Sequence, residues 1–237
     1  MIAVRLFALI LLAAFGATGA TVDPSCSPAA RYLAHGDTER ALQALAGLSG
    51  GSAENLRGLA LLVENDAAGA LRAFERASGE DPEAVEPRIN AAVALLRLDR
   101  PADAGAILDD LAGRELSPPL AYSVAYHRAL AARMQGRLDE ALAWSDRALE
   151  ADPDSADALL LSGTLLERMG RYERAGRRYK DYLGRHPGSI VAMLRFGVVA
   201  HRAGHRELAQ KYLREVSLRA PDSREAVEAR KFLLMWE

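Results

Sequence analysis

The chain of 237 residues carries 30 Lys and Arg against 32 Asp and Glu, a formal net charge of -2. This near-neutral balance argues against a nucleic-acid binder that works through charge. Half of the residues are hydrophobic and 26% are charged, which excludes an intrinsically disordered chain. Aromatic residues make up only 6%, and runs rich in Val, Ile and Thr are absent, so the composition predicts an all-α protein.

Residues 1–20 read MIAVRLFALILLAAFGATGA. One positive charge, Arg5, precedes an apolar run from Leu6 to Phe15, and small residues follow as far as Ala20, which is the layout of a secretory signal peptide. The run is shorter than the roughly 20 apolar residues that a membrane span needs. We therefore predict a signal peptide over residues 1–20 and a secreted, periplasmic protein.

Two alternatives for the N-terminus stay open. The first is an uncleaved membrane anchor that extends from Ile2 to Val22. The second is a lipoprotein that is cleaved before Cys26 and acylated there, although the preceding DPS lacks the apolar-small-small triplet that such processing favours. Cys26 is the only cysteine, so no disulfide can form within one chain and the fold depends on its apolar core.

A period of 34 residues runs through the rest of the sequence. Three columns share this spacing: Gly136, Gly170 and Gly204; Ala141, Ala175 and Ala209; Pro153, Pro187 and Pro221. Similar segments precede them, and we predict six repeats and a final helix at 224–237. The repeats cover about 22–50, 51–84, 85–118, 122–155, 156–189 and 190–223.

This pattern resembles the tetratricopeptide repeat, a helix-turn-helix motif of 34 residues. The resemblance covers residues 21–237 and implies a right-handed α-α superhelix of about six repeats with a C-terminal capping helix. Two residues depart from the pattern, because Ser145 stands where a large ring is usual and Tyr182 where a small residue is usual.

Each column has a physical role, which the fifth repeat illustrates. Gly170 allows the left-handed conformation that ends the first helix. Gly163 and Ala175 let the two helices approach closely, Tyr179 fills the space between them, and Pro187 ends the second helix. Serines that follow the prolines are expected to cap the next helices: Ser155, Ser189 and Ser223.

The resemblance also implies a concave groove lined by four positions of each first helix, among them Asp157 in the fifth repeat and Val191 in the sixth. The residues predicted to bind a partner there are Asn55, Leu59, Leu62, Ile89, Val93, Leu96, Tyr126, Leu130, Arg133, Leu160, Thr164, Glu167, Leu194, Val198 and His201. A subgroup of the family captures a C-terminal carboxylate with Lys, Asn and Arg, but those positions here hold Tyr126, Leu130, Leu161 and Asp157. An amphipathic helix or an extended apolar peptide is therefore the predicted ligand.

Charge is distributed unevenly along the chain. Residues 21–121 hold nine Lys and Arg against 16 Asp and Glu, and residues 122–237 hold 20 against 16. The most basic segment contains Arg168, Arg171, Arg174, Arg177, Arg178 and Lys180. A solvated helix face explains such a segment, and contact with an acidic partner or with anionic lipid headgroups is the alternative.

Motifs for catalysis, cofactor binding or metal binding are absent from the sequence. His201 and His205 have the spacing of a metal-binding pair, but Gly204 lies between them at a predicted turn. We therefore predict no catalytic residue, cofactor or metal. The predicted function is a non-enzymatic scaffold or assembly factor that binds protein partners in a bacterial cell envelope. The alternative is an accessory or regulatory subunit of an envelope enzyme, such as a peptidoglycan hydrolase.

Overall fold

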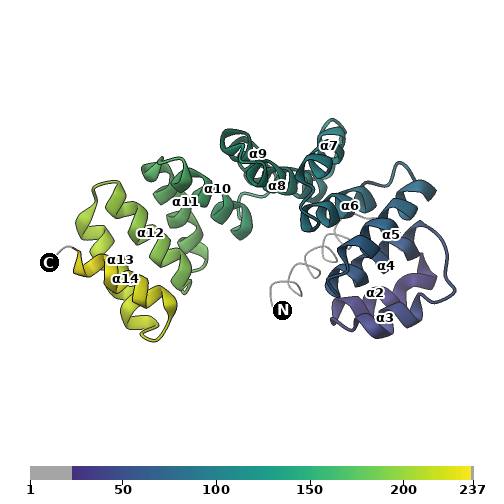
Figure 1. The fold of residues 1–237 in the computed structure, drawn as a ribbon, viewed down its shortest axis with the longest axis horizontal. Helices are drawn as coiled ribbons and strands as arrows, with labels where there is room; N and C mark the ends of the chain where they lie inside the picture. Colours follow the sequence, from purple (N-terminus) through teal and green to yellow (C-terminus); the bar gives the residue numbers. More distant parts are fainter. Residues whose placement is uncertain (1–22, 236–237) are drawn as a thin grey trace. The chain divides into compact units, whose positions relative to one another are not determined.

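The structure, a computed structural model, describes residues 23–235. Within that range it contains thirteen α-helices, a short 3-10 helix and no β-strand, as the all-α prediction requires (Figure 1). The elements are η1 (Pro24–Cys26), α2 (Ser27–Ala34), α3 (Thr38–Ala44), α4 (Gly51–Val63), α5 (Ala67–Glu80), α6 (Val85–Arg97), α7 (Pro101–Ala112), α8 (Pro118–Met134), α9 (Leu138–Ala151), α10 (Ala156–Arg168), α11 (Tyr172–Arg185), α12 (Ile190–Arg202), α13 (Arg206–Arg219) and α14 (Arg224–Leu234). The predicted signal peptide lies outside the described residues.

The chain divides into two compact units, and the division falls after Arg137. In the N-terminal unit, helices that follow one another along the chain pack together from α2 to α8 around one apolar core. In the C-terminal unit, the same sequential packing joins α9 to α14, and a second core lies among these helices. Sequential packing of helix pairs is the arrangement of an α-solenoid.

The turn between the two helices of each repeat contains one residue with a positive φ. Four of these residues are glycines, at φ angles from 71° to 89°: Gly36, Gly136, Gly170 and Gly204. The second and third repeats use Asn65, at 67°, and Asp99, at 56°, in the same place. Asn and Asp tolerate this conformation better than other residues with side chains. The predicted glycine turns are therefore confirmed. The second and third repeats have no glycine at this position and use Asn and Asp, which tolerate a positive φ.

Glycines on three first helices are required by the close approach of the second helix. A Cβ atom at Gly163 would lie 2.8 Å from the ring of Tyr179, and one at Gly58 would lie 2.4 Å from the ring of Phe74. In the sixth repeat, a Cβ atom at Gly197 would lie 2.8 Å from Leu213. The large side chains at these crossings are fully buried, as the pattern of small and large columns predicts.

Serine and proline residues set the helix ends. The hydroxyl oxygens of Ser155, Ser189 and Ser223 accept hydrogen bonds from backbone amides three residues later, at 3.3, 3.3 and 3.0 Å. These residues are therefore N-caps, as predicted. Pro118, the last residue of the predicted third repeat, instead begins α8. A proline suits this first position, since the amide that it lacks has no partner within the helix.

A histidine and an arginine are buried side by side in α8. Nδ1 of His127 donates to the carbonyl of Ser123 at 2.8 Å, and burial lowers the pKa of the imidazole to about 4. The next residue, Arg128, donates two hydrogen bonds to the carboxylate of Asp109, at 2.6 and 3.1 Å. The folded N-terminal unit thus holds one neutral imidazole and one paired guanidinium in its interior.

Replacing Gly163 with Ala should destabilise the C-terminal unit by roughly 1 to 3 kcal/mol, because the added methyl group overlaps the Tyr179 ring. Urea unfolding followed by circular dichroism measures this change. Gly184 is the matched control, since it lies in α11 and a Cβ atom added there would have no atom within 4 Å apart from its chain neighbours and the nearby backbone of its own helix. Gly184→Ala should leave stability unchanged or raise it by up to about 1 kcal/mol. Equal effects of the two substitutions would contradict the proposed close crossing.

The buried His127 should make stability depend on pH. Its folded pKa of about 4 lies below the ordinary value of 6.5, so its neutral form favours folding above pH 6.5. This contribution is lost as the pH falls from 6.5 toward 4, because the unfolded chain then binds the proton more tightly. The stability advantage of the wild type over His127→Gln should shrink by about 2 kcal/mol between pH 7 and pH 4.5. Unfolding curves at both values test this, and an unchanged difference would contradict it.

Candidate functional site

The residues predicted to line the groove differ in accessibility between the first helices. Those on α4 and α6 are interior residues, with Leu96 alone half-buried: Asn55, Leu59, Leu62, Ile89, Val93 and Leu96. The aliphatic ones among them belong to the apolar core of the N-terminal unit or pack against it. These positions therefore stabilise the solenoid, and their side chains offer little surface to a ligand.

Asn55 has a specific structural role in this interior. The side-chain amide of Asn90 donates a hydrogen bond of 2.9 Å to the amide oxygen of Asn55, and both side chains are buried. A buried polar group is stabilised when it finds such a partner. The two residues lie 35 positions apart, close to the repeat period, so the hydrogen bond joins one repeat to the next.

On α8, the predicted groove residues are more accessible. Tyr126, Leu130 and Arg133 are all half-buried. The Tyr126 ring stacks on Tyr122, with 5.7 Å between the centroids, and meets the His127 ring edge-on at 5.4 Å. This end of the N-terminal unit therefore presents an aromatic surface that is already packed by its own neighbours.

The C-terminal unit presents the most open part of the predicted groove. On α10, Leu160, Thr164 and Glu167 are half-buried, and on α12 Val191 is 51% exposed. The other groove positions of α12 are more protected: Leu194 and Val198 are buried and His201 is half-buried. We call Leu160, Thr164, Glu167 and Val191 the α10/α12 surface.

A hydrogen-bonded group organises the polar side of the α10/α12 surface. Glu167 accepts a hydrogen bond of 3.0 Å from the hydroxyl of Tyr179 and one of 3.4 Å from Arg195 on α12. The Tyr179 hydroxyl also lies 3.4 Å from the Thr164 hydroxyl, which donates to the Leu160 carbonyl at 2.8 Å. Burial raises the pKa of Tyr179, so its hydroxyl stays protonated and donates to the carboxylate.

A second carboxylate occupies a groove position near the start of α10. Asp157 is exposed as a whole residue, yet partial desolvation raises the pKa of its carboxyl. Together with Glu167 it gives α10 two acidic groups beside the apolar Leu160. Such a surface can bind an apolar segment and accept hydrogen bonds from it, and it contains no nucleophile paired with a base.

Three arginines in and near the basic segment hydrogen-bond to aspartates of α9 and of the turn that follows it. Arg171 donates to Asp139 at 2.9 Å, Arg178 to Asp146 at 2.7 Å and Arg185 to Asp154 at 2.8 Å. The partners are 31 or 32 residues apart, so the ion pairs connect successive repeats. Each partly exposed pair contributes about 1 kcal/mol or less. The solvated-face interpretation therefore accounts for these three arginines.

His201 lies in α12, whereas His205 is the N-cap residue before α13, because α12 ends at Arg202 and Gly204 has a φ of 89°. The predicted break between them is therefore confirmed. The His205 ring pairs with Glu173 at 2.9 Å. Across residues 23–235 the structure shows no group of three or more His, Cys, Asp or Glu residues that could hold a metal ion.

The partners that organise these surfaces do not follow from the sequence pattern. Arg195 is not among the predicted site residues, and Tyr179 is predicted only to fill the helix crossing. Both contact Glu167, at spacings of 28 and 12 residues that no single-helix pattern contains. A search for opposite charges 28 to 32 residues apart would find Arg195 and the aspartates of the α11 ion pairs.

Comparisons of structure identify helical repeat proteins of similar fold. PilW, described as a widely conserved type IV pilus biogenesis factor, is 22% identical and has a TM-score of 0.77, covering 88% of this chain and 96% of PilW. PilF of Pseudomonas aeruginosa is 18% identical with a TM-score of 0.76, covering 87% of this chain and 95% of PilF. MamA is 22% identical with a TM-score of 0.63, covering 71% and 91%. At these identities the likeness concerns the fold.

Comparisons of sequence agree with the fold. Human tetratricopeptide repeat protein 7A is 36% identical over 74 residues, which are 31% of this chain and 9% of that protein. The chain thus spans only a small part of this relative. The family profile described as "Tetratricopeptide repeat" matches residues 55–119, 90–156 and 146–190, which together exceed half of the chain. With its helix pairs, turn residues and close crossings, the chain belongs to the tetratricopeptide repeat family.

Proposed function

We propose that this protein is a non-enzymatic scaffold of the cell envelope that binds a partner protein through the α10/α12 surface. The observation that carries the proposal is the accessibility of apolar side chains there, with Leu160 half-buried and Val191 51% exposed. In the N-terminal unit, the predicted groove residues on α4 and α6 are almost all in the interior. A ligand segment therefore finds uncovered apolar area on α10 and α12.

The chemistry of this surface favours an apolar segment that also carries a hydrogen-bond donor. Leu160 and Val191 can bury aliphatic or aromatic side chains of the ligand, and burial of each contributes roughly 25 cal/mol per Å². Asp157 and Glu167 can accept hydrogen bonds, and Glu167 is held in place by Tyr179 and Arg195. A helix with an apolar face or an extended peptide meets both requirements.

The envelope location rests on two supports. The first twenty residues have the charge and apolar pattern of a signal peptide. PilW, which shares the fold, is described as a type IV pilus biogenesis factor.

None of the helices that the structure describes is long and apolar enough to cross a membrane. The Cys26 side chain is in the core of the N-terminal unit, where an acyl chain on its sulfur would displace packed residues.

A photoreactive p-benzoylphenylalanine at position 160 or 191 should crosslink to one envelope protein in living cells, because both positions are accessible on the α10/α12 surface. The adduct is detected as a band of higher mass and identified by mass spectrometry. Leu218 on α13 is the matched control, since it is 81% exposed and lies outside the predicted groove.

The same crosslinked partner at all three positions would contradict a specific α10/α12 site. Crosslinking from position 218 alone would move the binding surface to α13. A cytoplasmic protein as the main adduct from positions 160 and 191 would contradict the envelope assignment while leaving the binding surface intact. The two parts of the proposal are thus tested separately.

The mature N-terminus should begin near Thr21, because the small residues that end at Ala20 fit signal peptidase. Intact-mass measurement of protein purified from detergent-solubilised whole cells tests this prediction. A mass that begins at Cys26 with added acyl chains would support the lipoprotein alternative instead, and retention of residues 1–20 would support the anchor.

A further inference from the structure

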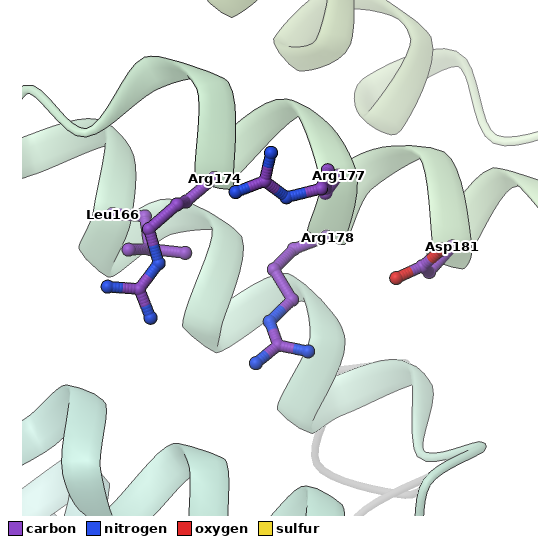
Figure 2. Close-up of a pocket in the computed structure, with 5 residues that line it drawn as sticks. All are labelled: Leu166, Arg174, Arg177, Arg178 and Asp181. Carbon is purple, nitrogen blue, oxygen red and sulfur yellow. The ribbon is translucent and has the colours of Figure 1, made fainter.

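We propose that a pocket on α11 binds the carboxylate of an acidic peptide segment from a partner protein, at a site separate from the α10/α12 surface. The pocket, which we call the α11 arginine pocket, is lined by Leu166, Arg174, Arg177, Arg178 and Asp181 (Figure 2). Leu166 comes from α10, and the other four residues come from α11. None of them belongs to the predicted groove.

The pocket has the dimensions and lining of a site for a single functional group. Its volume is about 190 Å³, below the roughly 300 Å³ at which drug-sized ligand sites begin. Figure 2 shows Arg174 and Arg178 extending to the same side of α11, with Arg177 directed back along the helix and Asp181 at the far end. Leu166 gives the pocket an apolar wall that can contact the methylene groups of a bound glutamate.

The guanidinium groups of the pocket are unequally neutralised. Arg178 donates to Asp146 at 2.7 Å and to the buried Ser162 hydroxyl at 3.1 Å, so its position is fixed. Arg174 is 4.0 Å from the other oxygen of Asp146, too far for a hydrogen bond. Within residues 23–235, no carboxylate forms an ion pair with the exposed Arg177. The guanidinium groups of Arg174 and Arg177 therefore have N–H donors that are available to bind an added anion.

The other repeats show that the fold does not require these arginines. At the positions one period before and after Arg174, the chain has Glu140 and Leu208. The positions equivalent to Arg178 hold Trp144 and Tyr212. The neighbouring packing column, by contrast, is alanine in all three repeats, because the helix crossing demands a small residue. Packing explains the shared column and leaves Arg174 and Arg177 unexplained.

An acidic peptide fits the surroundings of the pocket better than an anionic membrane. The carboxylates of Asp139 and Asp154, at 81% and 77% side-chain exposure, pair with Arg171 and Arg185, which precede and follow the pocket arginines in the sequence. A membrane presents a wide negative surface, which these carboxylates would repel. A single glutamate or aspartate can instead enter between them, and the planar guanidinium suits a carboxylate through paired hydrogen bonds.

The test uses the purified protein and a fluorescein-labelled, C-terminally amidated peptide of alternating glutamate and alanine. Fluorescence anisotropy should show saturable binding at low salt, and the glutamine version of the peptide should not bind. The double variant R174Q/R177Q should bind the peptide at least about tenfold more weakly, since it removes the two guanidinium groups whose N–H donors are available to the ligand. Arg214→Gln is the control, because Arg214 is an exposed arginine of α13, and it should bind as the wild type does.

Three outcomes would overturn the proposal. Equal losses for R174Q/R177Q and Arg214→Gln would indicate charge attraction without a site. Peptide binding that is abolished by L160Q/V191Q and unaffected by R174Q/R177Q would place the acidic ligand on the α10/α12 surface. Cosedimentation with vesicles of phosphatidylcholine and phosphatidylglycerol, lost in R174Q/R177Q and without peptide binding, would assign the pocket to a membrane. A circular dichroism spectrum that matches the wild-type spectrum confirms that each variant is folded.

Discussion

The contact between a glycine on one helix and a large side chain on the next determines more than the packing of each repeat. In the fifth repeat, the Tyr179 ring lies so close to Gly163 that a Cβ atom there would be 2.8 Å away. The ring is thereby fixed, and its hydroxyl reaches Glu167 at 3.0 Å. Phe74 and Leu213 fill the corresponding crossings without a hydroxyl group. A core contact in this repeat therefore also orients a polar group of the candidate site.

Contacts between repeats divide into buried and exposed kinds with different consequences. The Asn55–Asn90 hydrogen bond is buried, so losing one partner would leave an unsatisfied polar group at a cost of about 1 to 3 kcal/mol. The ion pairs of α11 with Asp139 and Asp154 are exposed to solvent and contribute little free energy each. Their effect is to orient Arg171 and Arg185, which lie at the two ends of α11 and do not line the α11 arginine pocket.

Local signals in the sequence are sufficient to predict the helix ends and crossings. Gly170 and Ser189 act through backbone conformation and a short-range hydrogen bond, so their roles can be predicted from neighbouring residues alone. Burial cannot be predicted in this way. Ile89 and Leu160 occupy equivalent groove positions in the third and fifth repeats, yet Ile89 is in the interior and Leu160 is half-buried. The difference depends on residues from other helices, which one repeat does not contain.

The repeats of one chain serve as controls for one another, and this comparison separates structure from function. Ala141, Ala175 and Ala209 are alike because the same crossing recurs, and their identity carries no information about a ligand. Residues that differ at equivalent positions are free of that requirement. Ser145 is one such residue, but it is buried and donates to the Ala158 carbonyl at 3.3 Å, so packing accounts for it. Arg174 and Arg177 are exposed and variable between repeats, and no contact that stabilises the fold explains them. A functional surface is therefore best sought among residues that are exposed and that differ from the residues at the equivalent positions of the other repeats.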